Sequence, residues 1–346
     1  MIKFKNVLVT GGSGFIGTNF INLLLEENLE LNIFNIDKLT YASNNKNHEA
    51  NLKSPSYNFI QGDICDRGLL DMVIEENSID CVIHFAAESH VDRSIEGPEE
   101  FLNTNILGTF NLLEASLKQY KSTDNFVFLH VSTDEVYGSL GSKDSSFTEE
   151  NQYLPNSPYS ASKASSDMLV RAWHHTFNLP TLTTNCSNNY GPYQFPEKLI
   201  PLTILNALNN QPITIYGDGK NIRDWLYVED HCIGILKVLK TGKLGEVYNI
   251  GGGNEYTNVE IVLKICAILD ILSPLNAKDS KISSYKELIT FVADRPGHDF
   301  RYSVNSSKLQ KSLNWEPKTS FDIGIKQTVE WYLKNPEWVK SVINKK

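Results

Sequence analysis

Two adjacent carboxylates and a hydroxyl follow a strongly apolar run in the middle of the chain. The run Phe126–Val131 leads into Ser132, and Thr133, Asp134 and Glu135 come directly after it. Neighbouring side chains at the end of a strand diverge, so the two carboxylates can serve different atoms. Two like charges in a closed site favour keeping one of them protonated, which is the condition for one acid and one base. A loop carboxylate pair that caps the next turn is the simpler alternative when the pair is taken alone.

A tyrosine and a lysine four residues apart form a second reactive group. Tyr159 and Lys163 lie in the segment Pro158–Phe177, which is expected to begin a helix with Ser157 as its N-cap. The four-residue spacing places both side chains on one helix face. A nearby ammonium stabilises a phenolate and lowers the pKa of tyrosine, so Tyr159 would serve as a base, while Lys163 would also bond a ribose. By spacing alone, an ordinary helix pair would be the better explanation.

A glycine-rich turn near the start of the chain predicts a nucleotide cofactor. Gly12–Gly17 fits G-x-G-x-x-G, Gly11 precedes it, a predicted strand comes before and a helix after. Glycines here let the backbone approach a pyrophosphate at the helix N-terminus. Asp37 ends the second predicted strand, twenty residues after Gly17. Its carboxylate suits ribose hydroxyls and repels a 2′-phosphate, which favours NAD over NADP, whereas a tight turn with a solvated aspartate is the plain alternative.

The three groups together match one sequence of chemical steps. Removing water from C6 of a hexose is difficult because the C5 proton is not acidic, and oxidation at C4 places that proton next to a carbonyl. A base then takes the C5 proton while an acid protonates the departing C6 hydroxyl, and the hydride returns to C6. Four side chains supply the two bases, the acid and a hydroxyl near the C4 oxygen: Tyr159, Glu135, Asp134 and Thr133.

Short apolar runs alternate with amphipathic segments in the first half of the chain. This pattern predicts an α/β fold, a Rossmann-type doubly wound parallel sheet with a smaller, mixed α/β C-terminal lobe. The expected strands are Val7–Thr10, Leu31–Ile36, Tyr57–Gln61, Asp80–Phe85, Phe126–Ser132 and Thr181–Asn185. The expected helices are Phe15–Glu27, Arg67–Glu76, Glu99–Tyr120 and Pro158–Phe177. Ligands bind outside the carboxyl ends of such strands, which is where the reactive groups fall.

The pattern of predicted elements changes after about Asn188, where the loops become longer and contain Pro and Gly. We expect a nucleotide-binding domain over residues 1–190 with a return segment near 226–252, in which Val247–Ile250 rejoins the main sheet. Residues 191–225 and 253–346 would then form a nucleotide-sugar-binding lobe. The helices expected in this half are Leu199–Asn209, Thr257–Leu269 and Phe321–Lys334.

Composition narrows the class of protein. The 346 residues are 41% hydrophobic and 21% charged, which is typical of a folded globular protein. The net charge of −9 disfavours sequence-independent binding to nucleic acid, and no apolar run is long enough for a membrane span. Five scattered cysteines without metal-ligand spacing, and a start without a secretory signal, predict reduced thiols in a cytoplasmic protein and no metal site.

The motifs together resemble those of the extended short-chain dehydrogenase/reductase family, and within it the nucleotide-sugar 4,6-dehydratases. The glycine turn and Tyr-x-x-x-Lys belong to the whole superfamily, whereas the Asp-Glu pair after Thr133 is specific to the dehydratases and absent from the epimerases of the same fold. The similarity extends over nearly the full length and is carried by Thr10–Gly17, Asp37–Thr40, Ala86–Ser94, Ser132–Gly138, Tyr159–Lys163, Asn185–Leu202, Arg223–His231 and Asp294–His298.

The resemblance implies a role for each matching residue. Asp134 would protonate the C6 oxygen, Glu135 would accept the C5 proton, and Tyr159 would be the redox base beside Lys163. It places NAD at Gly11, Gly12, Gly14, Phe15, Ile16, Gly17, Asp37, Lys38, Leu39, Thr40, Asp63, Ile64, Ala86, Ala87, Glu88, Ser89, Thr104, Tyr159, Lys163 and Asn189. It places the nucleotide-sugar at Ser89, Thr133, Asn188, Lys198, Leu199, Thr214, Ile215, Tyr216, Arg223, Asn258, Asp294, Arg295, Pro296, Gly297 and His298. Relatives form homodimers through two helices, here Glu99–Tyr120 and Pro158–Phe177.

The expected reaction is dehydration of dTDP-glucose to dTDP-4-keto-6-deoxyglucose, as in the biosynthesis of deoxysugars such as rhamnose. UDP-glucose is the first alternative substrate, because thymine and uracil differ by one methyl group. A 4-epimerase that eliminates nothing, and an inactive NAD-binding regulatory protein, are further alternatives. Among the histidines, His84 and His90 are expected to pack or hydrogen-bond, and His298 is a candidate substrate contact.

Overall fold

The computed structural model describes residues 4–27, 30–123, 125–275, 282–294 and 297–343. Its largest element is a seven-stranded sheet in the order β10-β6-β5-β4-β1-β2-β3, in which every neighbouring pair is parallel. The strands are β1 Asn6–Thr10, β2 Asn32–Asp37, β3 Tyr57–Gln61, β4 Cys81–His84, β5 Val127–Thr133, β6 Thr181–Cys186 and β10 Val247–Ile250. The predicted doubly wound parallel sheet is confirmed.

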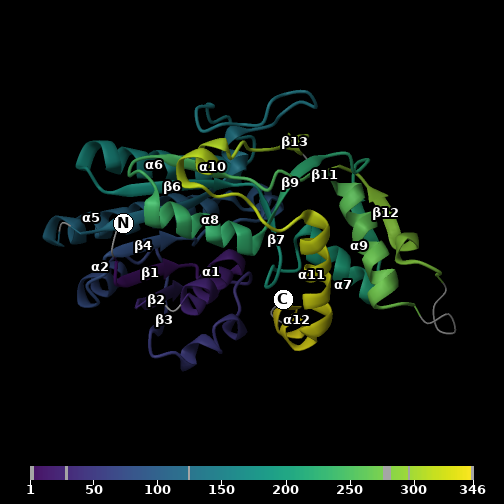
Figure 1. Cartoon of the computed structure of the whole chain (residues 1–346), viewed down its shortest axis with the longest axis horizontal. Helices are drawn as coiled ribbons and strands as arrows, with labels where there is room; N and C mark the ends of the chain where they lie inside the picture. Colours follow the sequence, from purple (N-terminus) through teal and green to yellow (C-terminus); the bar gives the residue numbers. More distant parts are fainter. Residues whose placement is uncertain (1–3, 28–29, 124, 276–281, 295–296, 344–346) are drawn as a thin grey trace.

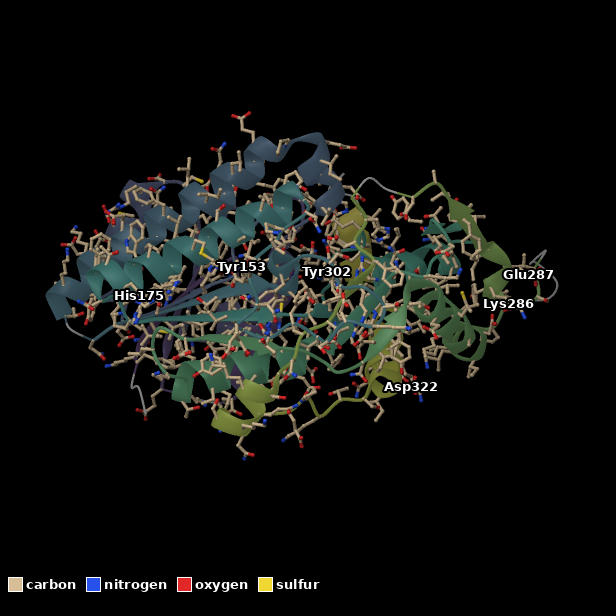
Figure 2. All side chains as sticks on the ribbon, turned by 90° about the horizontal axis from the view of Figure 1, so that it is seen from above. Tyr153, His175, Lys286, Glu287, Tyr302 and Asp322 are labelled. Carbon is tan, nitrogen blue, oxygen red and sulfur yellow. The ribbon has the colours of Figure 1, made fainter. Side chains whose placement is uncertain are left out.

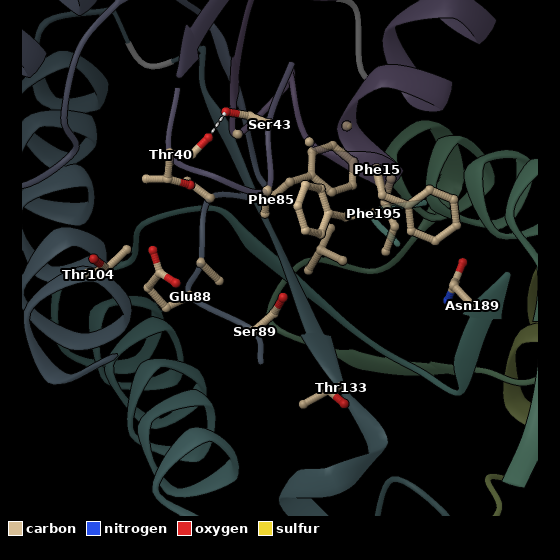
Figure 3. Close-up of a pocket in the computed structure, with 18 of the residues that line it drawn as sticks. Phe15, Thr40, Ser43, Phe85, Glu88, Ser89, Thr104, Thr133, Asn189 and Phe195 are labelled. Atoms are coloured by element: carbon tan, nitrogen blue, oxygen red, sulfur yellow. Dashed lines mark hydrogen bonds between the residues drawn. The ribbon is translucent and has the colours of Figure 1, made fainter. Parts of the chain in front are cut away.

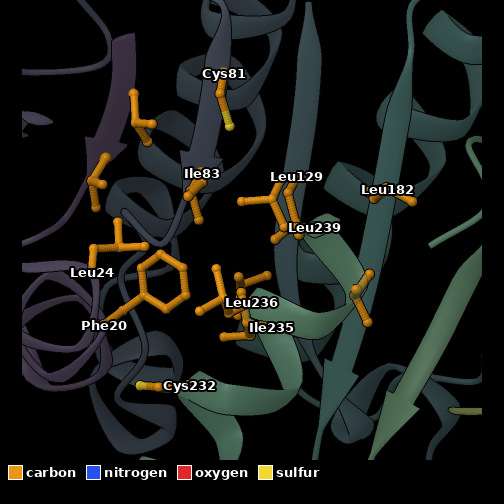
Figure 4. Close-up of a cluster of buried hydrophobic side chains, with 14 of the residues drawn as sticks. Phe20, Leu24, Cys81, Ile83, Leu129, Leu182, Cys232, Ile235, Leu236 and Leu239 are labelled. Carbon is orange, nitrogen blue, oxygen red and sulfur yellow. The ribbon is translucent and has the colours of Figure 1, made fainter. Parts of the chain in front are cut away.

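Helices cover both faces of this sheet because its strands are apolar on both sides (Figure 1). On one face, α1 (Phe15–Glu26) and α8 (Val228–Thr241) pack through residues such as Phe20 and Ile235 against Ile83 and Leu129 (Figure 4). The helices whose residues share the opposite cluster are α2 Arg67–Glu76, α5 Thr109–Thr123 and α6 Pro158–Phe177. The sheet is thus the buried middle layer.

Chain order along the sheet reverses next to β1, which has β2 on one side and β4 on the other. The chain runs from β1 to β3 in one direction and then from β4 to β6 in the other. A crevice opens at such a switch point, outside the carboxyl ends of the strands. The fold therefore places the ends of β1, β2, β4 and β5 around one potential ligand site.

A second group of elements packs around its own apolar cluster (Figure 1). Its strands are β7 Asn188–Tyr190, β8 Ile213–Tyr216, β9 Ile222–Tyr227, β11 Glu255–Thr257, β12 Ile289–Val292 and β13 Arg301–Tyr302. Its helices are α7 Leu199–Leu208, α9 Asn258–Leu272, α11 Phe321–Lys334 and α12 Pro336–Ile343. The short helix α10 Ser307–Leu313 returns to the first group, where Leu309 and Leu313 join the core beneath α8. This packing supports the two-part division that we propose, with α10 assigned to the first part, and β7 and the last residues of β9 assigned to the second.

Several elements differ from the sequence-based expectation. The predicted helix Glu99–Tyr120 is divided into α4 (Pro98–Phe101), a π-helical segment (Leu102–Gly108) and α5. The return segment contains the helix α8, which was not predicted as a helix. The short helix α3 covers Val91–Glu96.

Within the described ranges, none of the helices combines the length and apolar character that a membrane span requires.

Candidate active site

One cavity runs along the carboxyl ends of the central strands (Figure 3). Each strand end contributes residues to it: Gly11 after β1, Asp37 from β2, Asp63 after β3, Ala86 after β4 and Thr133 from β5. All the residues predicted to bind NAD line this cavity except Gly12 and Leu39. The catalytic residues predicted from the sequence line it as well. The cavity therefore joins the predicted cofactor groups and the predicted reactive groups in one space.

The glycine turn is required by close backbone contacts. Gly11 has φ +72°, and a Cβ atom there would lie 2.6 Å from the backbone nitrogen of Ala86. A Cβ at Gly17 would lie 2.4 Å from the carbonyl oxygen of Gly11. Helix α1 begins after Gly14. This N-cap residue has no side chain, so no side-chain hydrogen bond caps the start of the helix. The first amides of α1 are thus left for an anion, which suits the pyrophosphate of a dinucleotide.

Asp37 is held rigidly at the end of β2. Its two carboxylate oxygens accept hydrogen bonds from the backbone N–H groups of Ser13, at 2.9 Å, and Leu39, at 2.8 Å. Leu39 has φ +58°, a conformation that this short turn imposes. Leu39 and Gly12 thus shape the site without lining the cavity, since the amide of Gly12 donates to Asn35 Oδ1 at 3.0 Å. The fixed carboxylate suits the hydroxyls of an adenosine ribose.

The π-helical segment positions one wall of the cavity. It brings Thr104 to the cavity lining opposite Glu88 and Ser89 (Figure 3). The next residue, Asn105, exchanges two hydrogen bonds with the backbone of Glu88, at 2.9 and 3.0 Å, and donates a third to Ser162 Oγ at 2.8 Å. Asn105 therefore ties the loop after β4 to helix α6. Sequence reasoning missed it, although π-bulges occur frequently at functional sites.

Thr133, Asp134 and Glu135 occupy three different environments. Thr133 Oγ1 accepts a hydrogen bond from the backbone N–H of Glu135 at 3.3 Å, so the turn Asp134–Tyr137 is capped by the hydroxyl rather than by a carboxylate. Asp134 is 2% exposed, and its Oδ2 atom has no hydrogen-bond partner among the described residues. Glu135 is half-buried and lines the cavity. The simple capping explanation of the pair is therefore wrong.

Burial raises the pKa of Asp134 well above its usual range. The negative charges of Glu135 and Asp224 raise the pKa further, while Arg223 and a hydrogen bond from Thr133 lower it. Such a setting favours the protonated form of a carboxyl group. Asp134 thus has the protonation state of a general acid beside a second, more accessible carboxylate.

Tyr159 and Lys163 lie one turn apart at the start of α6, inside the cavity wall. The Lys163 Nζ atom donates to the carbonyl oxygen of Val131 at 3.0 Å. The expected lowering of the Tyr159 pKa is not observed. Burial and the negative charge of Glu135 raise this pKa well above the usual value, and a hydrogen bond from Thr133 only partly offsets the rise. Lys163 is bonded to the strand here rather than to the phenol, which explains the difference.

The predicted nucleotide-sugar residues fall into two groups. Ser89, Thr133, Asn188 and Lys198 line the cavity, and Lys198 Nζ donates to the carbonyl oxygen of Ser89 at 2.9 Å. Leu199 begins α7 directly after Lys198 but does not line the cavity. The oxygen Oδ1 of Asn188 has no partner among the described residues, so it is available to a ligand. This wall continues the site from the cofactor end toward the second group of elements.

The remaining predicted sugar-nucleotide residues that the structure describes lie outside this cavity, in the second group of elements. Thr214, Ile215 and Tyr216 belong to β8, Asn258 begins α9, and Arg295 and Pro296 fall outside the described residues. His298 Nδ1 lies 2.6 Å from Asp294 Oδ1, and the His298 ring meets the Tyr216 ring edge to face. Gly297 lies between these residues in the sequence. The structure therefore gathers Tyr216, Asp294 and His298 into one cluster.

Arg223 is buried in β9 rather than exposed to the cavity. Its guanidinium donates to the backbone carbonyls of Ile222, Phe300 and Asp299 at 2.7 to 3.3 Å and lies over the Tyr302 ring. The guanidinium of Arg223, a residue predicted to bind the nucleotide-sugar, is thus directed in part at backbone oxygens. Several cavity residues were not predicted as site residues: Phe85, Ser43, Ser187, Gln194, Phe195 and Glu197.

Two of the candidate histidines, His84 and His90, have the packing and hydrogen-bonding roles that were expected of them. His84 is buried between the hydroxyls of Thr10, at 2.7 Å, and Thr109, at 2.9 Å. His90 caps α3 by accepting from the backbone N–H of Arg93 at 3.3 Å. Burial lowers the pKa of His84 well below its usual value, so its ring stays neutral. All five cysteines are free thiols.

Comparison with known proteins places this site in a family. Residues 8–328 match the sequence profile of the family described as GDP-mannose 4,6 dehydratase. A dTDP-glucose 4,6-dehydratase of Neisseria meningitidis serogroup B is 52% identical over 345 residues, which cover 98% of this chain and 96% of that protein. The dTDP-glucose 4,6-dehydratase 1 of Escherichia coli K12 is 51% identical over 349 residues, 97% of this chain and 95% of that protein. The chain belongs to the dTDP-glucose 4,6-dehydratase family.

Solved structures agree with this family. DesIV of Streptomyces venezuelae, a dTDP-glucose 4,6-dehydratase crystallised with NAD and TYD bound, matches with a TM-score of 0.89 and 43% identity, over 97% of this chain and 99% of that chain. A UDP-glucose 4-epimerase of Thermotoga maritima matches with a TM-score of 0.83 but only 27% identity, over 96% and 99%. The epimerase shares the fold, whereas the dehydratases share both the fold and half of the sequence.

Proposed function

We propose that this chain is an NAD-dependent hydro-lyase that converts dTDP-glucose to dTDP-4-keto-6-deoxyglucose. The observation that carries the proposal is the pair Asp134 and Glu135 at the end of β5, in one cavity with Tyr159, Lys163 and the glycine turn. A redox site alone needs no such pair, because an epimerase returns the hydride to the carbon that lost it. The family membership and the roughly half-identical dehydratases support the same reaction.

The residues around the cavity fit NAD. The uncapped start of α1, the glycines whose Cβ atoms would collide with backbone, and the fixed Asp37 carboxylate suit a dinucleotide with an unphosphorylated ribose. When bound, NAD+ would accept the C4 hydride, and the NADH so formed would return it to C6. Gly11–Gly17 would hold the pyrophosphate, Asp37 the ribose, and the residues near Tyr159 and Lys163 the nicotinamide end.

Tyr159 takes the proton of the C4 hydroxyl in the proposed first step, and Thr133 hydrogen-bonds the C4 oxygen. Because burial and Glu135 raise the pKa of Tyr159, base function requires positive charge nearby. The Lys163 ammonium, one helical turn away, provides part of that charge on the protein side. The oxidation leaves a carbonyl at C4, and the C5 proton next to it becomes acidic.

Elimination then divides the work between the two carboxyl groups. Glu135, which lines the cavity, takes the proton from C5, while Asp134 donates its proton to the departing C6 hydroxyl, which leaves as water. The raised pKa of Asp134 favours the protonated form, from which this proton is donated to the C6 oxygen. Hydride addition at C6 and proton return to C5 complete the 4-keto-6-deoxy sugar.

One experiment tests both the catalytic activity and which nucleobase, thymine or uracil, the substrate carries. The protein is incubated separately with dTDP-glucose and UDP-glucose, kcat/KM is compared, and the products are identified by mass. We expect the loss of one water and a preference for the thymine nucleotide, in which one methyl group contributes roughly 10- to 200-fold. Equal or higher kcat/KM with UDP-glucose would reassign the substrate, and C4 inversion without loss of water would make the protein an epimerase.

We also propose that the chain forms a homodimer in the cytoplasm. Large apolar side chains are exposed on the segments expected to pair: Leu107 is 52%, Met168 50% and Phe110 38% exposed. Exposed apolar surface of this kind marks contact with another protein. The five free thiols fit a reducing compartment. Met168→Lys is expected to shift the protein from dimer to monomer in size-exclusion chromatography with light scattering; an unchanged dimer would contradict this pairing.

A further inference from the structure

A buried carboxylate lies one helical turn beyond Lys163. Lys163 and Asp167 are four residues apart on α6, so their side chains leave the same face of the helix. Both are almost completely enclosed: Lys163 is 4% exposed, and the Asp167 side chain is 3% exposed. Ionised groups are rarely enclosed in this way without a partner, because removing a charge from water is costly. The proposed catalytic cation therefore needs a compensating charge within the protein.

His130 is the hydrogen-bond partner of Asp167 but is not its cation. The His130 Nε2 atom lies 3.0 Å from Asp167 Oδ1, and the ring is fully buried on β5. Burial, reinforced by the charge of Lys163, lowers the pKa of His130 well below its usual value, so the ring is neutral. A neutral ring can donate through Nε2 and orient the carboxylate, but it supplies no positive charge. That leaves Lys163 as the charge that compensates Asp167.

The other groups around Asp167 are neutral. From β4, His84 faces His130 with ring centroids 5.3 Å apart and is itself held neutral by burial. Tyr153, which is labelled in Figure 2, precedes α6 in the chain. Its hydroxyl accepts a hydrogen bond from Asn185 at 3.0 Å, and burial raises its pKa. The hydroxyl of Ser132 also faces the carboxylate from β5, and burial raises the pKa of the Tyr137 phenol, another neighbour.

We propose that Asp167 is the counter-ion that keeps Lys163 in its ammonium form inside the closed site, with His130 fixing the orientation of the carboxylate. Asp167 is thus a positioning residue, since it acts on the reaction through Lys163. The catalytic part of this inference rests on the proposed function, whereas the charge pairing does not. Burial lowers the pKa of Lys163 and Asp167 raises it, while burial raises the pKa of Asp167 to about 6. Each charge of the pair therefore favours the charged form of the other group.

Asp167→Asn tests the effect on the reaction, because it removes the charge at nearly constant shape. The rate of NADH formation from dTDP-glucose in a single turnover is followed at 340 nm across pH. Loss of the carboxylate lowers the pKa of Lys163, so the alkaline limb of the profile should move down by about one pH unit or more. Asp167→Glu, which retains the charge, should restore the limb. Asp71→Asn, at a partly exposed ion pair on α2, should leave it unchanged. A profile that coincides with the unmodified enzyme overturns the proposal.

A stability cycle tests the pairing without any activity. Asp167→Asn and Lys163→Met each leave one enclosed charge without compensation, so each should lower Tm. The double variant removes both charges and should regain most of the combined loss. This measurement remains decisive if Asp167→Asn alone fails to fold, because the double variant should then fold. Additive losses in Tm would overturn the counter-ion assignment, whereas an inactive protein with a non-additive cycle would contradict only the proposed function.

Discussion

Asp134 and Glu135 are adjacent in the sequence and both line the cavity, yet Asp134 is only 2% exposed whereas Glu135 is half-buried. Strand β5 ends at Thr133, so successive side chains leave the backbone in different directions. Burial raises the pKa of the enclosed carboxyl, and the negative charge of its neighbour raises it further. In the proposed mechanism, one short segment thus provides the acid and the base that a single elimination requires at adjacent carbons.

Glu135→Gln is expected to separate oxidation from elimination. The variant should still form NADH with dTDP-glucose, because Tyr159 and Lys163 are unchanged, but it should stall before water is lost. We expect kcat for dehydration to fall by about 10²- to 10⁴-fold. The checks are absorbance at 340 nm and product mass, with Glu76→Gln on the exposed surface of α2 as the matched control. Normal dehydration would transfer the C5 base role to another residue.

Asp134→Asn should lower activity and raise stability. A carboxyl whose folded-state pKa is raised costs stability once the pH exceeds its unfolded value of about 3.9, because the unfolded chain then loses the proton more readily. The amide removes this cost, so Tm should rise at pH 7 and stay unchanged near pH 3. Elimination should slow because the C6 oxygen loses its proton donor. In the unmodified enzyme, activity should fall as the pH rises through the raised pKa. A lower Tm at pH 7 would contradict the buried acid.

Asp37→Ala should weaken NAD binding and relax the discrimination against NADP. The variant loses the carboxylate that accepts from the amides of Ser13 and Leu39. A hydrogen bond to a charged group contributes about 1.5 to 3 kcal/mol, so the Kd of NAD should rise by about 10- to 100-fold. Calorimetric titration of the purified variant with each cofactor measures both effects. An unchanged NAD affinity would remove Asp37 from the cofactor site.

His298→Ala should raise KM for the nucleotide-sugar and leave kcat nearly unchanged. His298 is bonded to Asp294 at 2.6 Å and lies in the cluster with Tyr216, away from the reactive carboxyl groups. Removing a contact that is equal in ground and transition states changes KM alone. An increase of about tenfold is expected, with His175→Ala at the exposed end of α6 as the control. A large fall in kcat would instead place His298 at the chemistry.

The elements that carry the site were predictable from the sequence because their signals are local. Alternating apolar runs gave the strands of the main sheet, and the Ser157–Pro158 start gave α6. The π-helical segment was not predictable, because it keeps the hydrophobic periodicity of a helix with only a local shift. Helix α8 was missed for a different reason. It lies between strands β9 and β10, in a part of the sequence where loops that contain Pro and Gly were the stronger signal.

The pKa values and polar contacts of the site residues were harder to predict than their positions in the fold. The sequence places Lys163 near Tyr159, which predicts a lowered tyrosine pKa, but burial and Glu135 dominate and raise it. Arg223 was predicted to bind the nucleotide-sugar, whereas in the fold its guanidinium donates hydrogen bonds to the backbone carbonyls of distant residues. Both effects depend on groups brought together only by tertiary packing, for which a linear pattern contains no signal.

The transfer of the C4 hydrogen to C6 tests the central claim most directly. dTDP-glucose labelled with deuterium at C4 is converted by the enzyme, and the product is analysed by NMR and mass spectrometry. We expect deuterium in the C6 methyl group, because the hydride removed from C4 is returned to C6 within the same closed site. A methyl group free of deuterium, with the label lost to solvent or retained at C4, would contradict the oxidation–elimination–reduction sequence.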